Sequence, residues 1–180
     1  MINNMDNMNF DLFTPTKLLF GCGKLEELSK QKLPGKKALL LISNGKSVYT
    51  NGAFDRTVAQ LDKASVEHAV CANIHENPTK EVVMEAAGVA RKNNCDFIVA
   101  LGGGAVLDAA IAVSAMATNP GELWDYVNGG TGKGLPLVNP GLPIVTIATT
   151  SGTGSEINCW GVISNLQTNE KIGFGRPSLN

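Results

Sequence analysis

Hydrophobic residues in this chain fall into short continuous runs that alternate with segments whose apolar positions recur every three or four residues. The continuous runs, typical of strands covered on both faces, are residues 37–42, 66–72, 97–101 and 143–148. The periodic segments, typical of helices with one buried side, are residues 24–28, 53–63 and 82–90, and residues 109–113 have the small apolar side chains of a helix packed on a sheet. This alternation predicts an α/β fold with a mostly parallel sheet, doubly wound by helices in the Rossmann-like manner, whose ligands bind at the carboxyl ends of the strands.

Smaller elements complete the predicted fold. A first short strand is expected at residues 17–21, where a glycine ends it. Asn77-Pro78-Thr79 predicts a helix start, with a capping side chain and a proline in the first turn. Residues 157–163 and 171–174 predict a β-hairpin added after the last parallel strand.

A long glycine-rich segment between residues 119 and 134 interrupts the alternation. Trp124 and Tyr126 lie between its two clusters of glycine, asparagine and proline. A loop of this length is either functional or mobile.

Composition describes one globular domain over residues 1–180. Of the 180 residues 43% are hydrophobic, 17% are charged and 20 are glycine, which is typical of an α/β protein with many turns. The formal net charge of −1 gives no electrostatic reason to expect nucleic acid or an anionic membrane as a partner. The segment Met1 to Asn9 lacks the pattern of a signal peptide, and no apolar run has membrane-spanning length, so we expect a cytoplasmic protein.

The residues that ligate metals are sparse. The four cysteines are scattered without a C-x-x-C pair and are expected to be small buried hydrophobes. The two histidines, His68 and His75, flank the end of the strand at 66–72, which the fold places on the adenosine side of a nucleotide crevice. Neither has a second ligand at a recognised spacing, so no metal site is expected in this chain.

The strongest candidate for a binding site is the junction between the strand at 97–101 and the following helix. Gly102, Gly103 and Gly104 carry no Cβ, so the backbone can turn sharply there and lie against a ligand, and Gly103 is either pressed against that ligand or held at positive φ. The free N–H groups of the first helical turn and the helix dipole favour an anion, for which a diphosphate is suited. The same dipole would stabilise the carboxylate of Asp108, about one turn into the helix. The alternative is a tight turn without a ligand.

A second glycine-rich turn favours the ligand. Residues 149–156, with the sequence Thr-Thr-Ser-Gly-Thr-Gly-Ser-Glu, follow another apolar strand directly. Two turns of this kind at strand ends can face one crevice.

These motifs, in this order, resemble the iron-containing (group III) alcohol dehydrogenases, most closely their butanol-dehydrogenase-like and NADPH-dependent aldehyde reductase branch. The resemblance covers nearly the whole chain through four motifs: Thr14-Pro15-Thr16 to Phe20-Gly21, Asn77-Pro78-Thr79, Gly102-Gly103-Gly104-x-x-x-Asp108 and the turn at 149–156. It implies the cofactor-binding N-terminal domain of that family, with the dehydroquinate synthase-like fold. In the family a helical C-terminal domain supplies an aspartate and three histidines for a divalent metal, iron or zinc, and these ligands would lie beyond Asn180.

The resemblance also implies roles for individual residues. Gly102, Gly103, Gly104 and Ala105 would cradle the diphosphate of a nicotinamide dinucleotide. Thr149, Thr150, Gly152 and Thr153 belong to the turn that would form the other wall of the cleft. Asn77 and Lys171 would reach the adenosine half.

Two departures from the family pattern concern the cofactor. Ala105 stands where the family often has serine, which removes a hydroxyl donor and about 1 kcal/mol of stabilisation but keeps the backbone N–H. The turn Asn44-Gly45-Lys46-Ser47 lacks the carboxylate that usually binds the ribose 2′-hydroxyl in NAD enzymes. Lys46 and Ser47 would suit a 2′-phosphate, so NADP is expected, with NAD possible; alternatively Lys46 is a solvated turn lysine.

The leading functional hypothesis is an NAD(P)-dependent alcohol dehydrogenase or aldehyde reductase, a homodimer at full length, acting on a primary alcohol or aldehyde that the metal polarises. A glycerol-dehydrogenase-like or dehydroquinate-synthase-like enzyme is a second hypothesis within the same fold, and the turn at 149–156 favours the alcohol dehydrogenases. A third is a nucleotide-binding module without catalysis. The chain ends just after Arg176-Pro177 without a closing element, which we interpret as the front part of a longer protein.

Overall fold

The computed structural model describes residues 14–175, so the expectations for Met1 to Asn9 and for Arg176-Pro177 lie outside the described residues. Its strands are β1 (Lys37–Ser43), β2 (Glu67–Ile74), β3 (Phe97–Gly102), β4 (Ile144–Ala148), β5 (Trp160–Asn165) and β6 (Glu170–Gly175). Its helices are η1 (Lys24–Lys30), α1 (Ser47–Thr50), α2 (Ala53–Lys63), α3 (Lys80–Lys92), α4 (Gly104–Thr118) and α5 (Leu123–Tyr126).

The first four strands form a parallel sheet in the order β2-β1-β3-β4, and β5 and β6 form a separate antiparallel hairpin. Each β1 residue from Ala38 to Leu41 pairs with both neighbouring strands, and β3 is buried along its whole length. The apolar runs are therefore continuous because both faces of the central strands are covered. The predicted parallel sheet with an added hairpin is confirmed.

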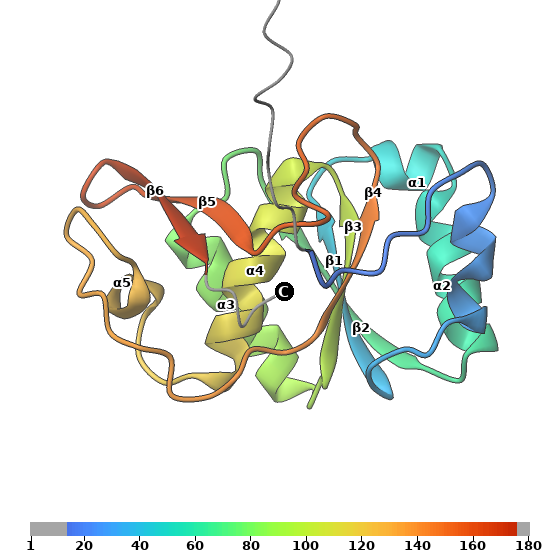
Figure 1. Cartoon of the computed structure of the whole chain (residues 1–180), viewed down its shortest axis with the longest axis horizontal. Coiled ribbons are helices and arrows are strands. Elements are labelled where there is room, and N and C mark those ends of the chain that lie inside the picture. Colours follow the sequence, from blue (N-terminus) through green and yellow to red (C-terminus); the bar gives the residue numbers. More distant parts are fainter. Residues whose placement is uncertain (1–13, 176–180) are drawn as a thin grey trace, which may run out of the picture.

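Helices cover both faces of this sheet, as Figure 1 shows. On one face Leu39, Leu41 and Ile98 pack with α3 and α4, while on the other Leu40 and Val99 pack with η1 and α2. Helix α4 is apolar on nearly every side because it lies between the sheet and the β5-β6 hairpin. Within residues 14–175, no helix combines the length and the apolar character needed to cross a membrane.

A capping signal in the sequence sets the beginning of α3. The Thr79 side chain accepts a hydrogen bond from the Val82 N–H, as expected of an N-cap. Pro78 precedes this cap, so the expectation that it occupies the first turn is wrong. Its carbonyl instead accepts the Ser164 N–H at 2.9 Å, which joins the start of α3 to β5.

The long loop predicted between residues 119 and 134 contains α5 and is anchored to the hairpin. The Glu170 carboxylate of β6 accepts hydrogen bonds from the Thr131 N–H at 2.7 Å, the Thr131 hydroxyl at 2.6 Å and the Trp124 indole N–H at 3.0 Å. The pKa of Glu170 falls to about 2, because the Thr131 hydroxyl, followed by that of Thr168, donates to its ionised form.

Three local predictions need correction. Residues 17–21 form no strand, and the side chains of Leu18 and Phe20 are 58% and 90% exposed, so this apolar run is not a buried strand. The predicted helix at 24–28 is a 3-10 helix, η1. Cys71 and Cys95 are buried as expected, but Cys22 is exposed and Cys159 is partly exposed.

Candidate functional site: two glycine turns at the switch point of the sheet

The strand order places the candidate site where the winding of the chain reverses. From β1 the chain passes to β2 on one side, then returns to β3 on the other side of β1. In open α/β sheets this reversal leaves a crevice beyond the carboxyl ends of the two strands. The turn at 44–47 follows β1, and the glycines at 102–104 run from the last residue of β3 to the first of α4, so both predicted sites lie at this edge of the sheet.

Neighbouring side chains leave little room for a Cβ in the glycine turn after β3. Gly102, Gly103 and Gly104 are not among the described residues that have a positive φ. Gly103 has φ −83° and ψ −175°, so of the two alternatives for Gly103 the positive φ is wrong. A Cβ on Gly102 would lie 2.6 Å from Cγ2 of the buried Val106, and one on Gly103 would lie 3.2 Å from Oγ1 of Thr150. Glycine is needed here for close approach rather than for a left-handed conformation.

The start of α4 leaves N–H groups free for a ligand. The Val106 and Leu107 N–H groups donate to the Gly103 carbonyl at 2.9 and 3.2 Å. Within residues 14–175, the N–H groups of Gly104 and Ala105 have no hydrogen-bond partner. Together with the dipole of a 15-residue helix, they provide donors and partial positive charge for an anion.

The second glycine turn packs directly on the first. The Thr149 N–H donates to the Gly102 carbonyl at 2.9 Å, and a Cβ on Gly104 would lie 3.0 Å from Cγ2 of Thr153. Gly152 has φ +94°, a conformation that favours glycine. Thr149, Thr150 and Thr153 are exposed, so their hydroxyls are available beside the free amides. The two turns are therefore in contact, and the expectation that they face one crevice stays a prediction.

Asp108 binds the second turn and the hairpin. Its Oδ1 accepts the Ser155 hydroxyl at 2.8 Å, and its Oδ2 accepts the Val162 N–H at 3.0 Å. Sequence reasoning placed Asp108 near the helix start but missed both partners. Ser155 lies within the glycine-rich motif and so had a local signal, whereas nothing in the sequence identified the Val162 amide.

The turn after β1 borders a cavity of about 520 Å³. Ser43, Asn44, Gly45, Lys46, Tyr49, Thr50 and Ala72 line it. Asn44, Gly45, Lys46 and Ser47 are all exposed. The Asn44 side-chain nitrogen lies 2.8 Å from Nδ1 of His75, so this pair links the ends of β1 and β2.

The structure brings Asn77 and Lys171 together, although 93 residues separate them in the chain. The Lys171 ammonium donates to the Asn77 side-chain oxygen at 2.7 Å, and both residues are exposed. Asn77 has φ +54°, a left-handed conformation that asparagine tolerates better than most residues. The predicted residues therefore form three groups, at the ends of β1 and β2 and around the two glycine turns.

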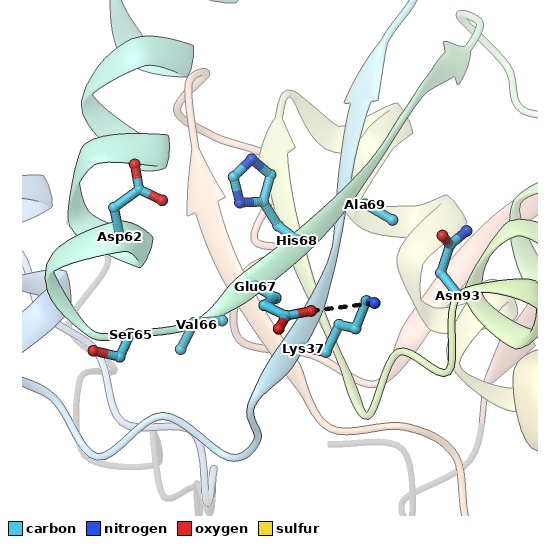
Figure 2. Close-up of a pocket in the computed structure, with 8 residues that line it drawn as sticks. All are labelled: Lys37, Asp62, Ser65, Val66, Glu67, His68, Ala69 and Asn93. Carbon is cyan, nitrogen blue, oxygen red and sulfur yellow. Dashed lines mark ion pairs between the residues drawn. The ribbon is translucent and has the colours of Figure 1, made fainter.

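A second cavity, of about 570 Å³, lies near the amino ends of β1 and β2. Figure 2 shows Lys37, His68 and Asn93 around it, with the Lys37 ammonium 3.3 Å from the Glu67 carboxylate. His68 is thus near the beginning of its strand, opposite the glycine turns, and its expected place on the adenosine side is wrong. His75 does lie at the carboxyl edge.

Within the part of the chain that the structure describes, no group of three or more His, Cys, Asp or Glu side chains could hold a metal ion. The residues of 14–175 therefore do not fit the divalent metal that the resemblance implies.

Comparison with known proteins identifies the family. Residues 15–180 match the family described as iron-containing alcohol dehydrogenase. The chain belongs to the iron-containing alcohol dehydrogenases. It is 38% identical over 169 residues to the probable NADH-dependent butanol dehydrogenase 1 of Bacillus subtilis (strain 168), covering 94% of this chain and 42% of that protein. This iron-containing alcohol dehydrogenase chain thus spans less than half the length of that curated relative.

Two solved structures support the same assignment. The NADH-dependent butanol dehydrogenase A from Thermotoga maritima aligns with a TM-score of 0.85 and 34% identity, over 95% of this chain and 42% of that one. Sulfoacetaldehyde reductase from Bifidobacterium kashiwanohense, solved in complex with NAD+, aligns with a TM-score of 0.80 and 26% identity, over 96% of this chain and 44% of that one. The α/β fold with a parallel sheet and a hairpin is therefore that of the matching part of these family members.

Proposed function

We propose that this chain binds a nicotinamide dinucleotide and forms the cofactor-binding part of an alcohol dehydrogenase or aldehyde reductase. The observation that carries the proposal is the pair of touching glycine turns at the switch point, where the amides of Gly104 and Ala105 are free. An anion-binding helix start at this position of an α/β sheet is typical of nucleotide sites.

The chemistry of the described residues fits a dinucleotide. The diphosphate would accept hydrogen bonds from the Gly104 and Ala105 N–H groups, and a side chain on Gly103 would crowd this position. The exposed hydroxyls of Thr149, Thr150 and Thr153 form the opposite wall. The Lys171-Asn77 pair offers polar groups near the end of β2 for the adenosine half. The nicotinamide, when bound, supplies or accepts the hydride.

We further propose that the cofactor is NADP in preference to NAD. The turn at 44–47 contains an exposed lysine and serine but no carboxylate to bind a ribose 2′-hydroxyl. Lys46 is one of the residues that line the adjoining cavity, where its ammonium would attract a 2′-phosphate. Because the Bacillus subtilis and Thermotoga maritima proteins are both named as NADH-dependent, the test compares both cofactors.

The test is a fluorescence titration of the chain with NADPH and NADH. We expect both to bind, NADPH more tightly, and we expect Lys46→Ala to weaken NADPH by about tenfold while changing NADH little, since charge-assisted hydrogen bonds contribute about 1.5–3 kcal/mol. Lys63→Ala is the matched control, because Lys63 is an exposed lysine in the last turn of α2. Failure to bind either dinucleotide would contradict the proposal, and tighter binding of NADH would contradict the NADP preference alone.

The activity of the whole protein follows as a further part of this proposal. A divalent metal, iron or zinc, would be held by residues outside 14–175, where it would polarise a primary alcohol or aldehyde. A longer protein, expected to be a cytoplasmic homodimer, would be assayed for NADP-linked oxidation of butanol with and without chelator. Robust turnover by the 180-residue chain itself would contradict the proposal that the metal is held by residues outside 14–175.

A further inference from the structure

Asp108 is set into the wall between the two glycine turns. It is half-buried on α4, about one turn after Gly104, and each carboxylate oxygen has its own partner. Oδ1 accepts the Ser155 hydroxyl at 2.8 Å, and Oδ2 accepts the Val162 N–H at 3.0 Å. One side chain therefore joins the helix that follows the first turn, the end of the second turn and strand β5.

The backbone of β5 lies unusually close to this point. A Cβ on Gly161 would lie 2.3 Å from the carbonyl oxygen of Asp108 and 2.8 Å from its Cα. Only glycine leaves room for such an approach, so the Val162 amide reaches the carboxylate directly. The close packing and the two hydrogen bonds are separate observations that fix Asp108 in the same orientation.

The second turn has few other attachments to α4. Residues 149–153 are exposed and belong to no helix or strand, and the turn ends at buried Ser155. Its contacts with the first turn include the Thr149 N–H bond to Gly102, the packing of two threonine side chains on Gly103 and Gly104, and the Ser155 hydroxyl beside Gly104. Segments with so few buried contacts open locally at low free energy, so the Asp108-Ser155 bond is a large part of what holds this wall.

We infer that Asp108 is a positioning residue that holds the second glycine turn against the first, and that it acts on a bound dinucleotide through Ser155 rather than by touching it. This inference rests on the proposed function for its effect on binding. The effect on the turn itself does not require a cofactor.

The first experiment measures hydrogen exchange in the chain without cofactor. Asp108→Ala should raise exchange at least about tenfold in residues 149–162, with little change in β1 and β2, because the freed turn opens more often. Asp108→Asn should restore most of the protection, since its amide oxygen can accept the Val162 N–H while its NH₂ donates to the Ser155 oxygen. Asp62→Ala removes an exposed carboxylate near the amino edge of the sheet and is the matched control. Unchanged exchange in Asp108→Ala would overturn the inference.

The second experiment is a double-mutant cycle on dinucleotide affinity. If Asp108 acts through Ser155, then Asp108→Ala and Ser155→Ala should each lower the affinity by about tenfold, and by about the same factor for NADH as for NADPH. The affinity of the double variant should be little lower than that of Asp108→Ala. Additive losses, or normal binding by Ser155→Ala together with poor binding by Asp108→Asn, would show that the carboxylate contacts the cofactor and would overturn the inference. If the wild-type chain bound no dinucleotide, the proposed function would fail, and hydrogen exchange would still decide whether Asp108 holds the turn.

Discussion

Alanine substitutions in the first glycine turn should separate folding from binding, because Gly102 and Gly103 face different surroundings. A Cβ on Gly102 would lie 2.6 Å from Cγ2 and 2.8 Å from Cβ of Val106, which is 2% exposed. A Cβ on Gly103 would lie 3.2 Å from Oγ1 and 3.3 Å from Cγ2 of Thr150, which is exposed and able to move aside.

The contact distances set the expected magnitudes. Carbon atoms in contact prefer separations of about 3.5–4.0 Å, so Gly102→Ala creates an overlap of about 1 Å with a side chain that cannot leave the core. Overpacking of this kind costs about 1–3 kcal/mol, and for a chain of this length each kcal/mol lowers the melting temperature by about 2–4 °C. Gly102→Ala should therefore melt about 2–12 °C below the wild type. Gly103→Ala should change the free energy of unfolding by less than about 0.5 kcal/mol.

Dinucleotide binding, in contrast to stability, should be more sensitive to a side chain at Gly103 than to one at Gly102. Gly103→Val places a branched side chain beside the free amides, so it should abolish dinucleotide binding or weaken it by at least about tenfold, while folding is less affected. The assays are calorimetric melting and fluorescence titration of the same variants.

The matched control is Gly88→Ala. Gly88 lies within α3, and a Cβ there would meet no atom within 4 Å beyond the backbone of its own helix, so alanine should stabilise the helix by about 0.5–1 kcal/mol. The reasoning would be refuted if Gly102→Ala melted with the wild type, or if Gly103→Val bound the dinucleotide normally.

Two further predictions concern the hairpin and the cysteines. The pKa of Glu170 is lowered from its ordinary value of 4.5 to about 2, mainly by the Thr131 hydroxyl, so its stabilising contribution should be complete above pH 4.5 and be lost as the pH falls toward 2. Because the Trp124 indole donates to Glu170, Trp124 fluorescence should change over the same pH range. Glu170→Gln should remove this change, and an unchanged acid transition in that variant would contradict the assignment. A thiol reagent should label exposed Cys22 well before Cys95, because burial raises the pKa of the Cys95 thiol and limits access; equal rates would argue against the packing of β3 and its surroundings.

Elements with a strong local pattern could be predicted from the sequence. The helix at 53–63 matches α2 to the residue, and the strand at 97–101 differs from β3 by one residue at its end. Both carry their signal locally, in helical periodicity or in an unbroken apolar run. The run at 17–21 contains three consecutive apolar residues but has no partner strand among the described residues, and a sequence pattern does not specify whether a neighbouring strand is present.

The sequence by itself determined the α/β class, the parallel sheet with its hairpin and the positions of the two glycine turns, because these depend on burial periodicity and on residues without a Cβ. The tertiary structure decided how those turns are used. It showed that Gly102, Gly103 and Gly104 lie in close contacts and do not have a positive φ, and that Asp108 binds Ser155 and the Val162 amide. Contacts between residues about 50 positions apart depend on how the helix, the turn and the hairpin pack together, and no local pattern of side chains records that packing.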